Sequence, residues 1–304
     1  MVRPDFFVIS SGYDSFYRRR GIDMADNLFS DLSKVGLGML SGMELYESEE
    51  KKPAEDKTEA AQAAAPVEKV FLFDKGYRCP VCDTEFKTKA VRTGKAKMIG
   101  ADTDLRPKYQ GIDSLKYDCI VCNKCGYSSL SRFFNNITSA QAKLIKANIT
   151  PHFKGVDDKC ETYSYDEAII RHQLALANAV IKKGKASEKA YTCLKIAWIL
   201  RGQGENLPED TKDKDKVLAA LKVKEKEYIK KAYEGFNVAI TKEMPPICGM
   251  DEWTCIYLVA DLARQCEEYS VSMKLLSDLI VSKTASAKLK DRARDMRKLL
   301  QDKL

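Results

Sequence analysis

The sequence predicts an α+β protein that is mostly α-helical. We expect a small β module of zinc-ribbon type, followed by an array of helical hairpins like those of tetratricopeptide repeats. Two matched Cys-x-x-Cys pairs lie within residues 70–134, and from Thr138 onward apolar residues recur at the spacing of one helix face. A length of 304 residues, with 44% hydrophobic and 31% charged side chains, suits two such globular units.

Composition divides the chain into four parts. An N-terminal segment (1–46) is joined by a low-complexity charged linker (47–69) to the cysteine-rich module (70–134), and a helical region (135–304) follows. The net charge of +7 arises in the last two parts and permits nucleic-acid binding without requiring it. No stretch approaches the roughly 18 apolar residues of a membrane span, and no secretory signal is present. We therefore expect a cytoplasmic protein.

The N-terminal segment is expected to contain an amphipathic helix between residues 24 and 47. Its apolar stripe consists of Leu28, Leu32, Val35 and Met39. The low basic content favours packing on this protein or on a partner over binding to a membrane surface. In a bacterial gene the codons of Arg19-Arg20 can form a ribosome-binding sequence ahead of Met24, so we expect residues 1–23 to be left untranslated.

The cysteines carry the strongest chemical signal. Ten of them in a long chain without a secretory signal favour metal ligation or buried thiols over disulfides. The pairs Cys79-Pro80-Val81-Cys82 and Cys122-Asn123-Lys124-Cys125 each place two thiolates on a tight turn, and Gly126 permits a positive φ after the second. Four thiolates fill the coordination sphere of Zn²⁺ and leave no position for water. We expect one structural Zn²⁺ per chain, although iron accepts the same ligands.

Cys119 adds a third Cys-x-x-Cys pattern, because it lies three residues before Cys122. It belongs to a run that has the composition of a strand, Lys116–Val121. We interpret Cys119 as a buried strand thiol and not as a ligand. A redox pair is the alternative for such a pattern, but a redox site needs one pair and this chain has two that match.

Between the two cysteine pairs, Glu85–Arg92 and Lys95–Ala101 are expected to pair as a hairpin around Thr93-Gly94. This hairpin would carry five basic side chains with no acid among them: Lys87, Lys89, Arg92, Lys95 and Lys97. Such a basic hairpin can contact the phosphate backbone of a nucleic acid. The alternative is a solvent-exposed strand edge that lysine protects from further pairing.

A second polar cluster consists of Asp102, Asp104 and Arg106. Groups of this kind usually tie down a loop through capping and a local ion pair, which is the role we expect here. The alternatives are a second metal site, a phosphate site, or an unrecognised catalytic site.

Taken in order, these motifs resemble a bacterial family known as domain of unknown function 2225. The resemblance covers residues 70 to about 282 and rests on Tyr77–Cys82, Phe86–Lys89, Asp102–Pro107 and Cys122–Tyr127. It implies that Cys79, Cys82, Cys122 and Cys125 are the family's four cysteines. In the family the position of Cys119 is usually aliphatic, and the module precedes tetratricopeptide-like helices. Since the family has no established activity, the resemblance implies an architecture and not a function.

The helical region shows start signals and apolar stripes. Thr138 with Gln141 and Ser164 with Glu167 have the form of capping boxes, and Ser187 is expected to cap the helix after the second. The stripes are Ile170, Leu174, Ala177 and Ile181, then Cys193, Ile196, Ala197 and Leu200, then Cys255, Leu258, Val259 and Leu262. His172, in the middle of a helix, is expected at the surface or in a groove. Stacked hairpins form grooves that bind peptides or partner proteins.

Three hypotheses for the function follow. The first is a zinc-stabilised scaffold or adaptor that binds a protein partner through its helical groove. The second is a nucleic-acid-binding ribbon that uses the five basic side chains. The third, an enzyme with a site near Asp102, is the weakest, because the chain lacks the common nucleotide-binding, metalloprotease and hydrolase motifs.

Overall fold

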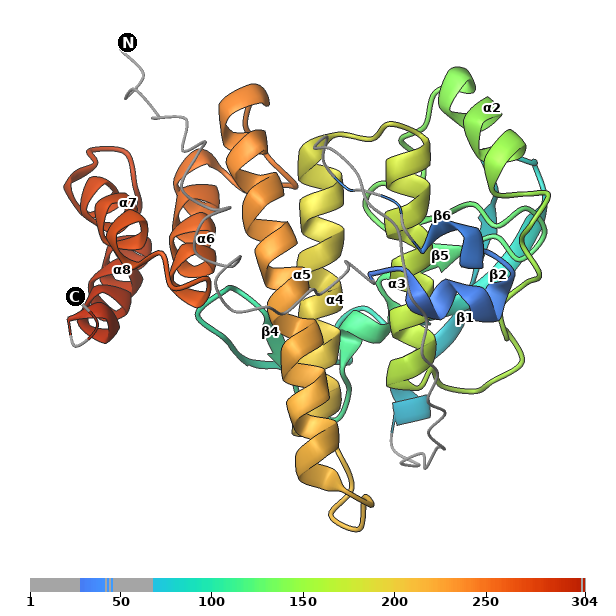
Figure 1. Cartoon of the computed structure of the whole chain (residues 1–304), viewed down its shortest axis with the longest axis horizontal. Coiled ribbons are helices and arrows are strands. Elements are labelled where there is room, and N and C mark those ends of the chain that lie inside the picture. The colour runs from blue at the N-terminus through green and yellow to red at the C-terminus, as the bar shows by residue number, and fades with distance from the viewer. Residues whose placement is uncertain (1–27, 42, 44, 46–67, 302, 304) are drawn as a thin grey trace, which may run out of the picture.

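The computed structural model describes residues 28–41, 43, 45, 68–301 and 303. The predictions for residues 1–23 and for most of the linker fall outside these residues. Within them the fold is mostly α-helical, with three small antiparallel sheets of two strands each (Figure 1). This confirms the fold class predicted from the sequence. No helix in the described ranges combines the length and the apolar character needed to cross a membrane.

The three sheets come from the cysteine-rich module. In the first, β1 pairs with β2, in the second β3 pairs with β4, and in the third β5 pairs with β6. The strands are β1 (Leu72–Arg78), β2 (Glu85–Val91), β3 (Met98–Ala101), β4 (Pro107–Tyr109), β5 (Cys119–Val121) and β6 (Ser128–Leu130).

The prediction of a hairpin around Thr93-Gly94 is wrong, because the two segments that flank this turn do not pair with each other. The strand over 85–91 pairs with β1, in a register that sets Arg78 opposite Glu85, and β3 pairs with β4 instead. The physical reason is that the first Cys-x-x-Cys turn is itself the loop of a hairpin. Its two flanking segments are held in register by that turn, which leaves Thr93-Gly94 as a connection between two different sheets.

The α-helices of the described chain follow the module. Their bounds are α2 (Ser139–Asn148), α3 (Tyr165–Ile181), α4 (Ala186–Glu205), α5 (Lys214–Lys242), α6 (Glu252–Gln265), α7 (Tyr269–Val281) and α8 (Ala287–Leu300). From α3 to α8, each helix packs against the next one along the sequence. Figure 1 shows α3, α4, α5 and α6 standing in a row, with α7 and α8 at the end opposite β1, β2, β5 and β6.

Local signals set several helix starts. Both predicted capping boxes are present, with Thr138 and Gln141 at the start of α2, and Ser164 and Glu167 at the start of α3. Ser187, which we expected to cap α4, lies inside the helix, and its hydroxyl donates instead to Glu243 (2.6 Å) at the end of α5. The hydroxyl of Ser187 therefore binds the carboxylate of Glu243, at the end of another helix, and does not bind a backbone N–H at the start of α4.

Helix α3 lies at the centre of the fold. It packs against α2, α4, β5 and β6, and against a short 3₁₀ helix near the N-terminus. Eleven of its side chains are buried, so apolar and polar residues alike are enclosed. His172 was expected at the surface or in a groove, but it is fully buried, and its Nδ1 donates to the carbonyl of Ala168 (2.7 Å). One hydrophobic core runs from the cysteines of the module into the helices.

The N-terminal segment differs from the expected amphipathic α-helix. It forms two 3₁₀ helices, η2 (Ser30–Val35) and η3 (Gly38–Leu40), separated by Gly36 with a left-handed φ of 85°. Three predicted stripe residues are buried, Leu28, Leu32 and Val35, whereas Met39 is 57% exposed. A left-handed residue cannot continue a right-handed helix, so Gly36 ends η2 and redirects the chain.

Candidate metal centre

Each Cys-x-x-Cys pair forms the tight loop of a β-hairpin. The first loop joins β1 to β2 and the second joins β5 to β6. In both loops the fifth residue has a left-handed backbone, Asp83 (φ 60°) and Gly126 (φ 75°), and its N–H donates to the carbonyl of the first cysteine at 2.9 Å. The two loops are therefore built alike, which is how two short turns can present equivalent pairs of sulfur atoms.

The two loops bring their four sulfur atoms together. The Sγ atoms of Cys79, Cys82, Cys122 and Cys125 all lie within 4.8 Å of one another. Across the loops, Cys79 and Cys125 are 3.6 Å apart, and Cys82 and Cys122 are also 3.6 Å apart. A disulfide needs a separation of about 2.05 Å, so these are four free thiols.

The spacing fits a tetrahedral metal ion. With metal–sulfur bonds of about 2.3 Å, the edge of an ideal tetrahedron of sulfurs is about 3.8 Å, close to the 3.6 Å observed. Cys79, Cys122 and Cys125 are buried and Cys82 is partly exposed. The four cysteines could hold one metal ion, and with four thiolates bound no position would be left for water or substrate.

Hydrogen bonds among Cys79, Cys122 and Cys125 shift the pKa values of these three thiols in opposite directions. Hydrogen bonds from Cys125 and Cys79 lower the pKa of Cys122 to about 2, while the hydrogen bond to Cys122 raises the pKa of Cys79 to about 12. The bond to Cys122 also raises the pKa of Cys125. Four sulfurs this close cannot all ionise without a compensating positive charge. A divalent cation supplies that charge and displaces the protons.

The second loop is held by the helical region. Thr150 Oγ1 donates to the carbonyl of Cys125 (2.9 Å), and Asn178 Nδ2 of α3 donates to the carbonyl of Gly126 (3.1 Å). Asn123 exchanges two hydrogen bonds with the backbone of Val156, at 2.9 and 2.8 Å. The backbone of the loop is therefore fixed by groups that lie outside the module.

Cys119 lies apart from the four clustered thiols. Its Sγ contacts Ser128 Oγ (3.2 Å) and donates to the carbonyl of Arg171 in α3 (3.1 Å). Burial raises the pKa of Cys119 to about 12, so it is a neutral thiol at the interface of β5 and α3. This placement matches the interpretation of a buried strand thiol.

Two of the five basic residues expected on the hairpin make contacts within the chain. Lys87, Lys95 and Lys97 are exposed, but Lys89 binds Asp74 of the paired strand at 2.7 Å. Arg92 donates to the carbonyl of Leu72 (2.9 Å) and lies over the ring of Phe73. Lys89 and Arg92 are thus engaged within the chain, whereas Lys87, Lys95 and Lys97 are exposed.

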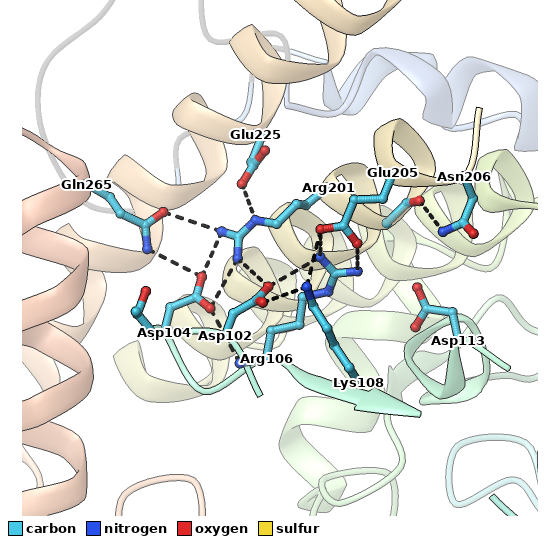
Figure 2. A network of polar contacts seen from close by, with 12 residues as sticks. Asp102, Asp104, Arg106, Lys108, Asp113, Arg201, Glu205, Asn206, Glu225 and Gln265 are labelled. Atoms are coloured by element: carbon cyan, nitrogen blue, oxygen red, sulfur yellow. Dashed lines mark hydrogen bonds and ion pairs between the residues drawn. The ribbon is translucent and has the colours of Figure 1, made fainter. Parts of the chain in front are cut away.

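The cluster at Asp102, Asp104 and Arg106 is part of a larger ion network, shown in Figure 2. Arg106 forms a bidentate pair with Glu205 of α4, at 3.0 and 2.7 Å. Arg201 of the same helix binds Asp104 at 3.2 and 2.7 Å, and Asp102 at 3.1 Å. The loop between β3 and β4 is thus attached to α4 and not only to itself.

Further helices join this network. Arg201 Nε donates to Glu225 of α5 (2.6 Å), and Gln265 of α6 donates to Asp104 (3.3 Å). Lys108 binds Asp102 at 2.8 Å. Burial raises the pKa of Asp102, but the hydrogen bonds from Lys108 and Arg201 outweigh it and hold this pKa below its usual value. Both aspartates are engaged by cations of the chain, in agreement with a role in tying down the loop.

Several residues of these sites carry no signal in the sequence. Asp83 repeats the left-handed turn of Gly126 without being a glycine. Thr150 and Asn178 support the second loop from 25 and 52 positions away. Arg201 and Glu205 lie almost 100 residues after the aspartates and arginine that they bind. A weak internal repeat, which aligns Glu205 with Glu267 and Gln203 with Gln265, marks this part of the helices without indicating those partners.

Comparison with known proteins places the chain in a family. The model of the family described as "uncharacterized protein conserved in bacteria" (DUF2225) matches residues 72–300. This span includes all six strands, the four clustered cysteines and helices α2 to α8. No curated protein and no solved structure shows significant similarity to the chain.

Proposed function

The chain belongs to this uncharacterised bacterial family, and we propose that it is a cytoplasmic, zinc-stabilised scaffold that binds a protein partner. The metal would be Zn²⁺, bound once per chain by Cys79, Cys82, Cys122 and Cys125. With four thiolates bound, the metal offers no open position for a substrate. Its contribution would be to hold the two hairpin loops together and to fix what packs against them.

One observation carries the proposal: the second cysteine loop is attached to the helices by its own backbone. The carbonyls of Cys125 and Gly126 accept hydrogen bonds from Thr150 and Asn178. A Cβ at Gly126 would lie 2.7 Å from Phe153 and 2.8 Å from Ile149, so the loop also packs tightly. Metal binding therefore stabilises the position of α3, and through it the surface of the helical row. We infer that this surface, of tetratricopeptide type, is the part that binds.

The first test is metal content. We expect one zinc per chain after anaerobic purification, lost in Cys125→Ser and retained in Cys160→Ser. Cys160 is a matched control because it is a half-buried thiol. With Asp157 and Glu167 it forms a second group of side chains, among the described residues, that could hold a metal ion. Capture of a partner by the wild type and its loss in Cys125→Ser would support the scaffold. A wild-type protein without metal would contradict the proposal.

A nucleic-acid ligand is the second candidate, favoured by one feature of the β1–β2 hairpin. Lys75 lies over the ring of Tyr77 and Arg92 over that of Phe73, and the exposed Lys87 is paired across the two strands with Gly76, between Lys75 and Tyr77. Cations beside aromatic rings are typical of surfaces that bind single strands. Binding that weakens steeply with salt would support this candidate.

The slope of that salt dependence identifies the residues that bind phosphate. If Lys87 neutralises one phosphate group, Lys87→Ala should reduce the slope by about one. Lys89→Ala is the matched control, because Lys89 is already paired with Asp74 and should change the slope less. Equal slopes for wild type and Lys87→Ala would show that this hairpin is not part of a nucleic-acid interface.

A further inference from the structure

A segment outside the family match is packed into the helical region. We call residues 28–41, 43 and 45 the plug. Six of its apolar side chains are at most 4% exposed: Leu28, Phe29, Leu32, Val35, Leu37 and Leu45. They belong to the same core as α3, α4 and α5, and η2 lies against α3 (Figure 1). The plug thus covers apolar surface that belongs entirely to the family domain.

The polar contacts of the plug are those of a bound peptide. Tyr228 of α5 donates to the carbonyl of Leu28, Lys189 of α4 donates to that of Leu45 (2.7 Å), and the N–H of Lys154 donates to that of Val35 (2.9 Å). Three separate elements of the domain therefore bind backbone oxygens of the plug, from its first described residue to its last.

One position of the plug admits only glycine. A Cβ on Gly36 would lie 2.2 Å from the carbonyl oxygen of His152 and 2.6 Å from Lys154 Cγ, and the residue has a φ of 85°. Both features oppose a side chain. Gly38, two residues later, lies at an ordinary φ, and its Cβ would meet only Ser33 at 3.4 Å. The close approach of the chain at Gly36 is thus a specific feature of the contact with the 152–154 loop.

The plug has little structure of its own. Its helices are 3₁₀ segments of six and three residues, which are too short to be stable alone. Its conformation is therefore imposed by the surface that it covers. By composition, the segment that joins it to the domain at residue 68 is a linker, rich in Ala, Glu and Lys. A ligand tethered by such a linker acts at an effective concentration in the millimolar range.

We propose that the plug is a tethered peptide ligand, and that the surface beneath it on α3, α4 and α5 is the docking site for a partner segment. The proposal rests on the scaffold function above and names its binding surface. The partner segment carries apolar side chains at the spacing of Phe29, Leu32, Val35 and Leu37, with glycine between the last two. An apolar surface of this kind needs a cover in water. The plug supplies that cover until a partner displaces it.

The test uses the full chain and a fluorescent peptide with the sequence of residues 28–45. Gly36→Ala should release the plug without removing any of its apolar side chains, and Gly38→Ala is the matched control. We expect the peptide to bind Gly36→Ala at least tenfold more tightly than wild type or Gly38→Ala, in which the site is already occupied. Zinc content and helical circular dichroism, read in the same samples, report separately on the scaffold.

Three outcomes would overturn the proposal. Equally weak peptide binding to folded Gly36→Ala and to wild type would show that the surface does not recognise the plug sequence. Unfolding of Gly36→Ala, with Gly38→Ala folded, would make the plug a fixed part of the core. A wild-type dimer that exchanges plugs would assign the site to a second copy of the chain and not to a partner.

A second measurement tests the same proposal without the Gly36→Ala variant. A protease site placed within residues 46–67 of the wild-type chain allows the tether to be cut after folding. We expect the labelled peptide to replace the severed segment, with the domain still folded and its metal retained. A severed segment that never exchanges would overturn the proposal.

Discussion

Arg201 provides a sharp test of the ion network between the module and the helices. Replacement by Met keeps an unbranched apolar stem and removes the guanidinium group, with its charge and all its donors. Arg201 binds Asp104, which is completely buried, through two contacts of 3.2 and 2.7 Å. In the variant, Asp104 would keep only the longer bonds from Gln265 (3.3 Å) and from the N–H of Arg106 (3.4 Å).

The expected loss of stability follows from this geometry. Removing one partner of a buried ion pair costs about 3–5 kcal/mol, because the other charge stays buried. We expect the lower end, about 3 kcal/mol, because Arg201 is itself 19% exposed and two donors to Asp104 remain. In a domain of this size, 3 kcal/mol corresponds to a fall in Tm of about 6–12 °C.

The assay is denaturation by heat and urea, followed by circular dichroism, with Arg294→Met as the matched control. Arg294 forms a surface pair with Asp291, both more than half exposed, and should change stability by less than about 1 kcal/mol. Adding Asp104→Asn to Arg201→Met should recover part of the loss, because the buried charge is gone. A loss below about 1 kcal/mol in Arg201→Met, or no recovery in the double variant, would refute this account of the network.

Two further predictions concern the second cysteine loop and the centre of α3. Gly126→Ala should destabilise the protein by about 2 kcal/mol more than Gly94→Ala, because both glycines have a left-handed φ but only Gly126 would place its Cβ against Phe153 and Ile149. Equal losses in urea titrations would contradict this. Burial lowers the pKa of His172 to about 4, below an unfolded value of about 6.5. The unfolded state therefore binds more protons between these values, and wild type should lose about 2 kcal/mol between pH 7 and pH 5. This part of the pH dependence should vanish in His172→Gln, and the same slope in both proteins would show that His172 is not its source.

The sequence predicts the candidate metal centre better than the sheets around it. The ligands are set by a local spacing, because two thiolates three residues apart share a turn whatever the rest of the fold does. The pairing of the strand over 85–91 depended on whether Thr93-Gly94 or the first cysteine turn closes its hairpin. Both are short turns between strand-like segments, but only the turn at Cys79–Cys82 also contains a pair of cysteines.

Other features depended on contacts between distant parts of the chain. Helical periodicity predicted α3, but not that β5 and β6 pack against it or that His172 is buried. The aspartates of the β3–β4 loop were expected to make a local ion pair. The shortest contact of Asp104, at 2.7 Å, is to Arg201, which lies 97 residues away, and no pattern in a single sequence connects these two positions.

The contacts of the module with α4 predict which parts of the fold a bound metal would stabilise. The module reaches this helix near its start, where Ser129 donates to Glu188 (3.5 Å), in its middle, where Lys195 binds Asp118 (2.9 Å), and near its end through Arg201. Asp118 lies directly before β5, which leads into the second cysteine loop. Removal of the metal should therefore loosen α4 along its length, and not only the loop.

Hydrogen exchange can test this, because α8 supplies an internal control. Helix α8 packs against α6 and α7, at the end of the row opposite the two cysteine hairpins β1–β2 and β5–β6 (Figure 1). After chelation, amides in α3 and α4 should exchange faster by at least tenfold, which corresponds to about 1.4 kcal/mol of lost protection. Amides in α8 should change much less. Faster exchange confined to the two cysteine loops would mean that the helices hold their positions without the metal. The metal would then stabilise the module alone, and the scaffold would not depend on it.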